Sequence, residues 1–315
     1  MNTVPKKVVV ATRGSKLALW QAEHVKSLLE DNYPGLEVEL NKIKTSGDKI
    51  TDVPLAKIGG KGLFVKEIEE ALLDGSADLA VHSLKDVPGE VPAGLQFGAF
   101  PERGDFADCF LSEMYQDLSE LPYDAVVGTS SVRRQSQLKA LRPDIEIHNL
   151  RGNLDTRIRK LGEGMFDAII VAAAGLKRLG FGAKYEYRLV PPEFLPGVGQ
   201  GSLGIEVRED NREILELLSC LDHLPTRYAI NTERSFLQRL EGSCQVPIGG
   251  KALIRDDNEL EFHGLVSDLQ GENIISSRGE DLLENSAKLG MRVADDILNR
   301  GGREILEEIY KLEQK

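Results

Sequence analysis

The sequence lacks a basic overall charge and any apolar run long enough to cross a membrane. Acidic residues number 51 against 39 basic ones, which gives a net charge of −12. Nucleic-acid-binding proteins usually carry a basic field, so this balance opposes that class. No apolar stretch approaches the ~20 residues of a membrane-spanning helix. We therefore expect neither nucleic acid nor membrane among the partners of this chain.

Cysteine is also scarce. The three cysteines, Cys109, Cys220 and Cys244, are widely spaced, which makes a poor disulfide framework and lacks the spacing of zinc ligands. No metal site is predicted. The N-terminal residues 1–7 have no signal-peptide layout. Together these features predict a cytoplasmic protein with reduced thiols.

Two consecutive strand-to-helix turns carry hydroxyl groups and arginines. The first is Gly128-Thr-Ser-Ser-Val-Arg-Arg134, placed between an apolar run and a segment with helical spacing. The second is Arg151-Gly-Asn-Leu-Asp-Thr-Arg157. Helix N-termini favour anions, so we interpret the turns as an unpaired cationic lining for a small or oligomeric anion. The alternative is that these arginines are solvated or bridge Asp and Glu, which is the better explanation for any one of them alone.

The chain of 315 residues is long enough for two or three domains, and its pattern predicts an α/β fold. The strand Lys7–Ala11 ends at Thr12-Arg13-Gly-Ser15, where Ser15 caps a helix that runs to about residue 30. Because strand, hydroxyl-rich turn and helix recur around Gly128, we expect two related α/β units facing one ligand. The inner face of the first helix is predicted to carry Leu17, Trp20, Val25 and Leu28.

The strand Leu203–Val207 is too isolated to begin a new domain, and we expect it to return to the first sheet. The chain would then cross between the units near residues 100–105 and again near 191–201, which makes a hinge and a cleft. After Leu221 a helix, three short strands and two helices predict a small α+β domain. The predicted domains are residues 1–101 with 199–219, residues 102–198, and residues 220–315.

Asp86 is the first candidate for chemistry. It follows the apolar strand Asp78–His82, and ligands of open α/β sheets bind at the carboxyl ends of strands. Arg13 is expected at the same edge. A carboxylate among cations would keep its charge and could stabilise a positively charged intermediate. The alternative is a turn residue that bonds to its own backbone.

Cys244 is the second candidate, because it lies in the tight loop Gly242-Ser-Cys-Gln245 rather than in an apolar stripe. A cysteine exposed near arginines would be a reactive thiolate, although most lone cysteines are inert. Cys220 and Cys109 are predicted to be small buried side chains in a helix and a strand. His82 is more often a satisfied core histidine than a base.

Taken together, these motifs resemble the hydroxymethylbilane synthase (porphobilinogen deaminase) family over essentially the whole chain. The family fold implied is two hinged α/β domains of the periplasmic-binding-protein type II kind, followed by a smaller α+β domain with a three-stranded antiparallel sheet. The family also implies a monomer. The matching segments are Ala11-Thr-Arg-Gly-Ser15, Leu17-Ala-Leu-Trp-Gln21, Gly59-Gly-Lys-Gly-Leu-Phe64, Ala80-Val-His-Ser-Leu-Lys-Asp-Val-Pro88, Gly128-Thr-Ser-Ser-Val-Arg-Arg-Gln135, Leu150-Arg-Gly-Asn153, Gly197-Val-Gly-Gln-Gly201 and Leu240-Glu-Gly-Ser-Cys-Gln-Val-Pro247.

The resemblance implies a transferase of haem biosynthesis with a covalent dipyrromethane cofactor, joined by a thioether to Cys244. Porphobilinogen molecules are added stepwise, each addition releases ammonia, and water then frees the linear tetrapyrrole hydroxymethylbilane. Asp86 is implied as the catalytic residue, which accepts hydrogen bonds from pyrrole N–H groups and offsets the charge of a cationic azafulvene.

The resemblance also assigns binding roles, residue by residue. Each pyrrole ring carries carboxylates, and the planar fork of arginine suits them. The implied cofactor-binding residues are Cys244, Asp86, Ser83, Lys85, Thr129, Ser131, Arg133, Arg134, Arg157 and Gln200. The implied substrate-binding residues are Arg13, Gln21, Arg151, Arg157, Arg178, Lys57 and Lys61, the last in a loop over the cleft.

One rival interpretation is a two-domain small-anion-binding protein without catalysis. It would explain the hinge and the arginines, but it would need neither Cys244 nor a third domain. The intact mass separates the two, since a covalent cofactor makes the protein heavier than its sequence.

Overall fold

The computed structural model describes residues 5–49, 62–242, 246–255 and 258–313. The lysines Lys57 and Lys61 and the cysteine Cys244 lie outside these ranges. The chain divides into two compact units, each described by itself below. The first unit comprises Met1–Ile50, Gly60–Gly104 and Gly201–Arg227, and the second comprises Thr51–Gly59, Asp105–Gln200 and Tyr228–Lys315.

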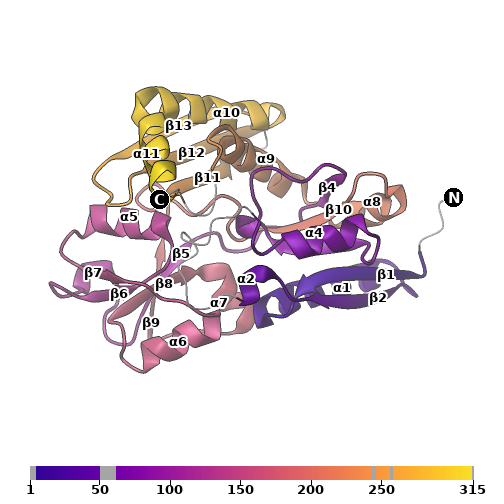
Figure 1. Ribbon diagram of the computed structural model, residues 1–315, viewed down its shortest axis with the longest axis horizontal. Coiled ribbons are helices and arrows are strands. Elements are labelled where there is room, and N and C mark those ends of the chain that lie inside the picture. Colours follow the sequence, from indigo (N-terminus) through magenta and orange to yellow (C-terminus); the bar gives the residue numbers. More distant parts are fainter. Residues whose placement is uncertain (1–4, 50–61, 243–245, 256–257, 314–315) are drawn as a thin grey trace. The chain divides into compact units, whose positions relative to one another are not determined.

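The first unit is built on a five-stranded sheet of order β2-β1-β3-β10-β4 (Figure 1). The strand β1 is parallel to β2 and β3, whereas β10 is antiparallel to both of its neighbours. The strand expected to return to the first sheet is β10, so that prediction is confirmed. The bounds of the strands are β1 (Lys7–Arg13), β2 (Glu37–Ile43), β3 (Leu79–Ser83), β4 (Leu95–Ala99) and β10 (Leu203–Arg208).

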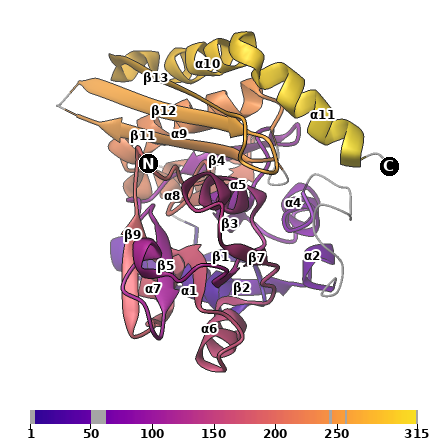
Figure 2. The same ribbon diagram turned by 90° about the vertical axis from the view of Figure 1, so that its left-hand side faces the viewer.

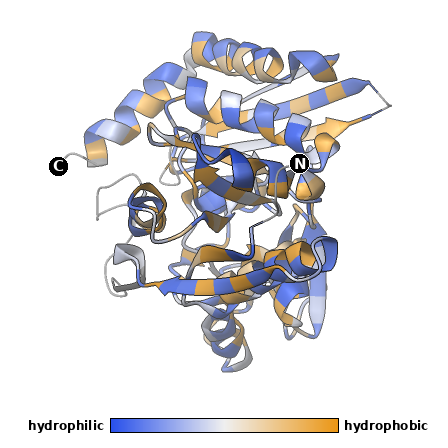
Figure 3. Ribbon diagram, turned by 90° about the vertical axis from the view of Figure 1, so that its right-hand side faces the viewer, coloured by the Kyte–Doolittle hydropathy of each residue, from blue (hydrophilic) through white to orange (hydrophobic). Residues whose placement is uncertain are grey.

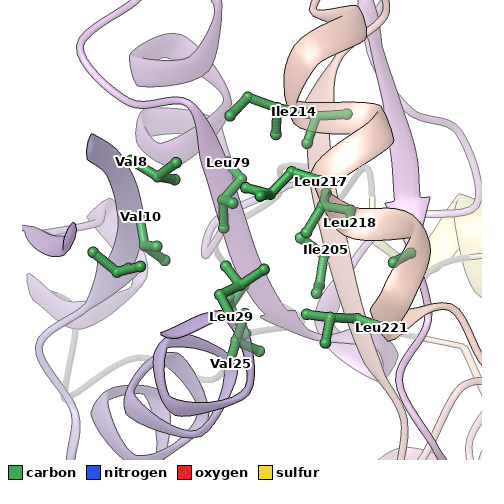
Figure 4. Close-up of a cluster of buried hydrophobic side chains, with 14 of the residues drawn as sticks. Val8, Val10, Val25, Leu29, Leu79, Ile205, Ile214, Leu217, Leu218 and Leu221 are labelled. Carbon is green, nitrogen blue, oxygen red and sulfur yellow. The ribbon is translucent and has the colours of Figure 1, made fainter. Parts of the chain in front are cut away.

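Helices cover both faces of this sheet. One face packs against α1 and α8 through aliphatic side chains such as Val10, Leu29 and Leu217 (Figure 4). The other face packs against α4 through a smaller cluster that includes Ala11, Ala80 and Leu72. The helical elements of the unit are α1 (Lys16–Asn32), α2 (Ser46–Lys49), α4 (Lys66–Leu73), η1 (Leu84–Asp86), α8 (Arg212–Leu218) and η3 (Ser219–Leu221).

The inner face of α1 differs from the predicted one at Trp20. This side chain is 37 % exposed and stacks on His24 at a centroid distance of 5.1 Å. The buried stripe instead runs through Gln21, Val25 and Leu29, which are spaced four residues apart and so lie on one side of the helix. The predicted cap is confirmed, since Ser15 accepts a hydrogen bond from the backbone N–H of Ala18.

The second unit contains another five-stranded sheet, of order β7-β6-β8-β5-β9. Its pairing repeats that of the first sheet: β6 is parallel to β7 and β8, and β5 is antiparallel to β8 and β9. The expected relation between two α/β units is therefore confirmed. The elements are β5 (Asp108–Ser112), η2 (Leu118–Glu120), β6 (Val126–Gly128), α5 (Val132–Leu141), β7 (Glu146–His148), α6 (Leu154–Gly162), β8 (Ala168–Ala172), α7 (Ala173–Leu179) and β9 (Tyr185–Leu189).

The second unit also contains a three-stranded antiparallel sheet, the meander predicted from the sequence (Figure 2). Helices α9 and α10 pack on one face of it and cross closely at Gly290, where a Cβ would lie 2.1 Å from the carbonyl oxygen of Thr232. Hydrophobic and hydrophilic faces are visible on α11 (Figure 3), which buries Leu306 and Ile309. The elements are α9 (Leu224–Arg239), β11 (Ile248–Ile254), β12 (Glu259–Ser267), β13 (Ile274–Leu282), η4 (Leu283–Asn285), α10 (Ser286–Ile297), η5 (Leu298–Gly302) and α11 (Arg303–Glu313).

Candidate functional site

The first unit has a pocket where β1 and β3 end. The parallel strands β1 and β3 bring their carboxyl ends to one edge of the sheet, which is where open α/β sheets bind ligands. Arg13, the last residue of β1, and Asp86, in the turn after β3, both line the pocket. The prediction that Asp86 and Arg13 share an edge is therefore confirmed.

Neighbouring side chains hold the pocket walls in place. The Gln21 amide nitrogen of α1 lies 2.7 Å from the hydroxyl oxygen of Ser83. The Arg13 guanidinium lies 4.2 Å from the ring centroid of Phe64, a cation–π contact that orients it. The pocket thus combines a cation, an anion and several neutral polar groups within one unit, which suits a ligand that carries both N–H donors and carboxylates.

The pocket wall also contains His82, which is buried and lies 2.9 Å from Glu206 through Nε2. The prediction of a satisfied core histidine is confirmed. Glu69 of α4 is close enough to interact electrostatically with both. Burial, with a further contribution from the charge of Glu206, raises the pKa of Glu69 to about 7, and His82 opposes this rise.

The Glu69→Gln variant is expected to lose less stability than the wild type as the pH rises. The folded-state pKa of Glu69 is raised from 4.5 to about 7, so its contribution is fully present below 4.5 and is lost as the pH rises through about 7. The melting temperature of the wild type should therefore fall more between about pH 5 and pH 8 than that of Glu69→Gln. The matched control is Glu70→Gln on the exposed side of α4. Equal slopes for wild type and Glu69→Gln would contradict the assignment.

In the second unit, Arg133 and Arg134 of α5 are buried and both pair with the carboxylate of Asp108. Arg133 Nη1 lies 2.7 Å from Asp108 Oδ2, and Arg134 Nε and Nη2 lie 2.9 and 2.7 Å from Oδ1. Gln200 Nε2 adds a hydrogen bond of 3.0 Å to the same Oδ1. Although burial alone would raise it, the two guanidinium groups hold the pKa of Asp108 well below its usual range.

The expectation of an unpaired cationic lining is therefore wrong for Arg133 and Arg134. They are 6 % and 5 % exposed and share the fully buried Asp108. This is the alternative that the sequence left open, in which arginines bridge an acidic residue. The physical reason is that two guanidinium groups inside a domain need a counter-charge, and the first residue of β5 supplies it.

The other three arginines predicted to bind carboxylates in the second unit have different surroundings. Arg151 precedes α6 and has a buried Nε with no hydrogen-bond partner among the described residues. Arg157 Nε donates a 2.8 Å hydrogen bond to the carbonyl of Gly152. Burial lowers the pKa of Arg178 to about 10. A buried, unpaired donor such as Arg151 Nε is costly unless an acceptor is brought to it, so this position suits an incoming anion.

In the turn Gly128–Arg134, the hydroxyl group of Thr129 lies close to the backbone. The Thr129 side chain is buried and its Oγ1 lies 3.3 Å from the N–H of Ser131, the N-cap residue of α5. Lys85, in η1 of the first unit, is half-buried. Thr129, Ser131 and Lys85 are thus placed in turns that follow strands, as expected from the sequence.

The cysteine predictions have mixed outcomes. Cys109 is buried in β5 as predicted, and burial raises the pKa of its thiol to about 11. The prediction of a buried Cys220 is wrong, because the side chain is exposed. It belongs to the short helical turn η3 after α8, and the buried residue of that turn is Leu221.

Sequence reasoning missed Asp108, Glu206 and Glu69. Each is a charged residue in a segment whose other side chains are largely buried and apolar, namely β5, β10 and the inner face of α4. A lone charge within such a run was the available signal, since it requires a buried partner.

Comparison with known families identifies the chain. Residues 8–216 match the family model described as porphobilinogen deaminase, dipyromethane cofactor binding domain, and residues 228–299 match the porphobilinogen deaminase C-terminal domain. The chain belongs to the porphobilinogen deaminase family. This confirms the resemblance stated from the sequence motifs.

Curated relatives named porphobilinogen deaminase match along nearly their whole length. The protein of Nitratidesulfovibrio vulgaris strain DP4 is 58% identical over 306 residues, with 97% of both chains covered. That of Maridesulfovibrio salexigens is 53% identical, covering 97% of this chain and 99% of the relative. The relative from Sulfurimonas denitrificans is 49% identical and covers 96% of each.

Two solved structures with other names match the chain distantly. The BenM effector binding domain with benzoate has a TM-score of 0.44 at 15% identity, covering 70% of this chain and 91% of that one. The BvgS periplasmic VFT2 domain of Bordetella pertussis has a TM-score of 0.41 at 16% identity, covering 74% and 93%.

The residues of the cofactor-binding domain fit a dipyrromethane of this family. Its pyrrole N–H groups require an acceptor, and the Asp86 carboxylate lines the pocket of the first unit. The anchoring residue predicted from the motifs, Cys244, lies outside the described residues, as do Lys57 and Lys61.

Proposed function

We propose that this chain is a hydroxymethylbilane synthase, a transferase that joins four porphobilinogen molecules stepwise with release of ammonia. Water then frees the linear tetrapyrrole. The observation that carries the proposal is the match of both family domains, which together span most of the chain, with relatives 58% and 53% identical over 97% of its length. The pocket that holds Asp86 and Arg13 within the first domain supports it.

Asp86 is proposed to be the catalytic residue. Its carboxylate accepts hydrogen bonds from pyrrole N–H groups and stabilises the positive charge that develops as ammonia departs. Ser83 and Lys85 are proposed to bind alongside it, and Gln21 orients Ser83 through their hydrogen bond. Arg13, held over Phe64, is proposed to bind a substrate carboxylate.

The second-unit residues are proposed to bind the carboxylates of the growing chain. Arg151, Arg157 and Arg178 are substrate-binding, and Arg157 also binds cofactor, as do Thr129 and Ser131. The cofactor is also proposed to be bound by Arg133, Arg134 and Gln200, which surround Asp108. Because Asp108 neutralises part of their charge, they contribute directed N–H donors more than net positive charge.

The dipyrromethane cofactor is proposed to be joined to Cys244 by a thioether. When bound, it supplies the primer on which the chain grows. Lys57 and Lys61 are proposed to bind substrate. The alternative, an anion-binding protein without catalysis, is not favoured, since the chain matches an enzyme family along its length.

Intact mass spectrometry tests the attachment. The wild type is expected to be heavier than its sequence by one dipyrromethane, whereas Cys244→Ser is expected to have the sequence mass, because serine offers no thiolate. Cys220→Ser is the matched control, and it should keep the added mass although Cys220 is the exposed thiol among the described cysteines. A wild type of sequence mass that still makes hydroxymethylbilane would refute the covalent cofactor.

Three further statements remain predictions. The domains are proposed to be residues 1–101 with 199–219, residues 102–198, and residues 220–315, the last with Cys244. The protein is proposed to be a cytoplasmic monomer that binds neither nucleic acid nor membrane. Among the described residues, no helix has both the length and the apolar character needed to cross a membrane.

A further inference from the structure

The face of the first sheet beneath α4 buries three ionisable side chains. His82 of β3 is 5 % exposed, Glu206 of β10 is fully buried, and Glu69 of α4 is 9 % exposed. His82 and Glu206 point to the same face, because Glu206 pairs with Ala80 and Ala80 lies two residues from His82. The cluster that surrounds them under α4 is aliphatic. Burying such groups in an apolar layer is costly, so a purely structural layer would be expected to avoid them.

The hydrogen bond between His82 and Glu206 leaves one ring nitrogen for chemistry. Nε2 lies 2.9 Å from Glu206 Oε2. Because an ionised carboxylate can only accept, we assign the proton of the neutral ring to Nε2, which leaves the lone pair on Nδ1. A carboxylate in this position orients the imidazole and stabilises the cation that forms when Nδ1 is protonated. Glu206 Oε1 has no hydrogen-bond partner among the described residues, so His82 is the partner that the structure gives this carboxylate.

His82 connects this buried group to the pocket, because it lines the same pocket as Asp86. The charged groups that face it come from each neighbouring element. Arg13 comes from β1, Asp86 from η1, Glu206 from β10 and Glu69 from α4; β4, with the sequence Leu-Gln-Phe-Gly-Ala, contributes none. The imidazole therefore lies between one carboxylate at the pocket and others in the interior.

Building on the proposed function, we propose that His82 Nδ1 accepts the proton released at each carbon–carbon bond formation, with Glu206 as its positioning residue. The C–N bond of a protonated aminomethyl group breaks, and its electron pair leaves with the nitrogen as ammonia. A pyrrole α-carbon then uses a ring electron pair to form the new bond. The same carbon loses its proton, and the C–H electron pair restores the aromatic ring. The proton passes to Nδ1, directly or through one water, and then to the ammonia, which departs as ammonium.

The variant that isolates this role is His82→Gln. The glutamine amide N–H can still donate to Glu206, but its amide oxygen is too weak a base to take up a proton in place of Nδ1. The kcat for tetrapyrrole formation is expected to fall about 100-fold, the usual order for a lost general base. The covalent cofactor should remain in the intact mass. With porphobilinogen deuterated at its free α-carbon, the isotope effect on kcat should be larger in the variant than in the wild type, because proton removal becomes slower.

Glu206→Gln provides the second variant, and it removes the charge while keeping an amide oxygen. The acidic limb of its kcat profile is expected to shift to lower pH, a change that a purely structural role would not produce. A third measurement needs no variant. In ¹⁵N-histidine-labelled wild-type holoenzyme, the His82 signal should show the proton on Nε2 in the neutral ring.

Each outcome of these experiments either supports or overturns the role proposed for His82. A His82→Gln enzyme with wild-type kcat and an unchanged isotope effect overturns the proposal, and so does a neutral His82 with its proton on Nδ1. Should His82→Gln fail to fold, the tautomer in the wild type and the profile of Glu206→Gln give the answer. A wild type that makes no hydroxymethylbilane would refute the proposed function instead.

Discussion

Replacing Asp86 with asparagine is expected to lower kcat for tetrapyrrole formation by about 100-fold or more, the scale of losing one preorganised charge at a reacting centre. The amide keeps the size of the carboxylate and one acceptor oxygen, but it lacks the negative charge that stabilises a developing cation. Asp86 lines the pocket with Arg13 and Ser83, so the loss should fall on the chemical step. The intact mass should still include the cofactor.

The matched control is Asp74→Asn in the same unit. Asp74 is an exposed residue after α4 that accepts a hydrogen bond of 2.8 Å from the Ser76 N–H, and it does not line the pocket. Its kcat should equal that of the wild type. Near-normal turnover in purified, cofactor-loaded Asp86→Asn would remove this carboxylate from the mechanism.

Asp108→Asn is expected to lower the free energy of unfolding by about 3–5 kcal/mol, the cost of breaking a buried ion pair from one side. The variant leaves Arg133 and Arg134 buried without their shared counter-charge. Urea denaturation of the second-unit transition would measure the change. Asp295→Asn is the control, since its pair with Arg239 is about half exposed and should cost no more than about 1 kcal/mol.

The ion pairs of Asp108 also predict that the protein loses stability at acidic pH. Because the folded state holds the pKa of Asp108 below its ordinary value of 3.8, its contribution is present above that pH and is lost as the pH falls below it. The stability of Asp108→Asn should therefore decrease less on acidification than that of the wild type. A parallel decrease in both proteins would show that Asp108 does not carry this dependence.

Local patterns predicted most of the elements. The strands around Val10 and Ile170 are short apolar runs ended by turn residues, and the Ser15 cap is a local hydrogen bond, so the sequence contains the information directly. Trp20 and Cys220 were wrongly predicted to be buried. Helical spacing shows which residues share one side of a helix, but not which side turns toward the sheet. The buried stripe through Gln21 and Val25 depends on which side chains of β1 and β3 lie beneath α1.

The motifs along the chain determined the family, the α/β class and the edge at which Asp86 and Arg13 meet, because those features follow from residue order and strand direction. Only the tertiary structure decided which ionisable side chains pair with one another. Asp108 precedes Arg133 by 25 positions and Glu206 follows His82 by 124, so no local pattern could pair them. Electrostatic pairing depends on distance and burial, and both are fixed only when the sheets and helices pack.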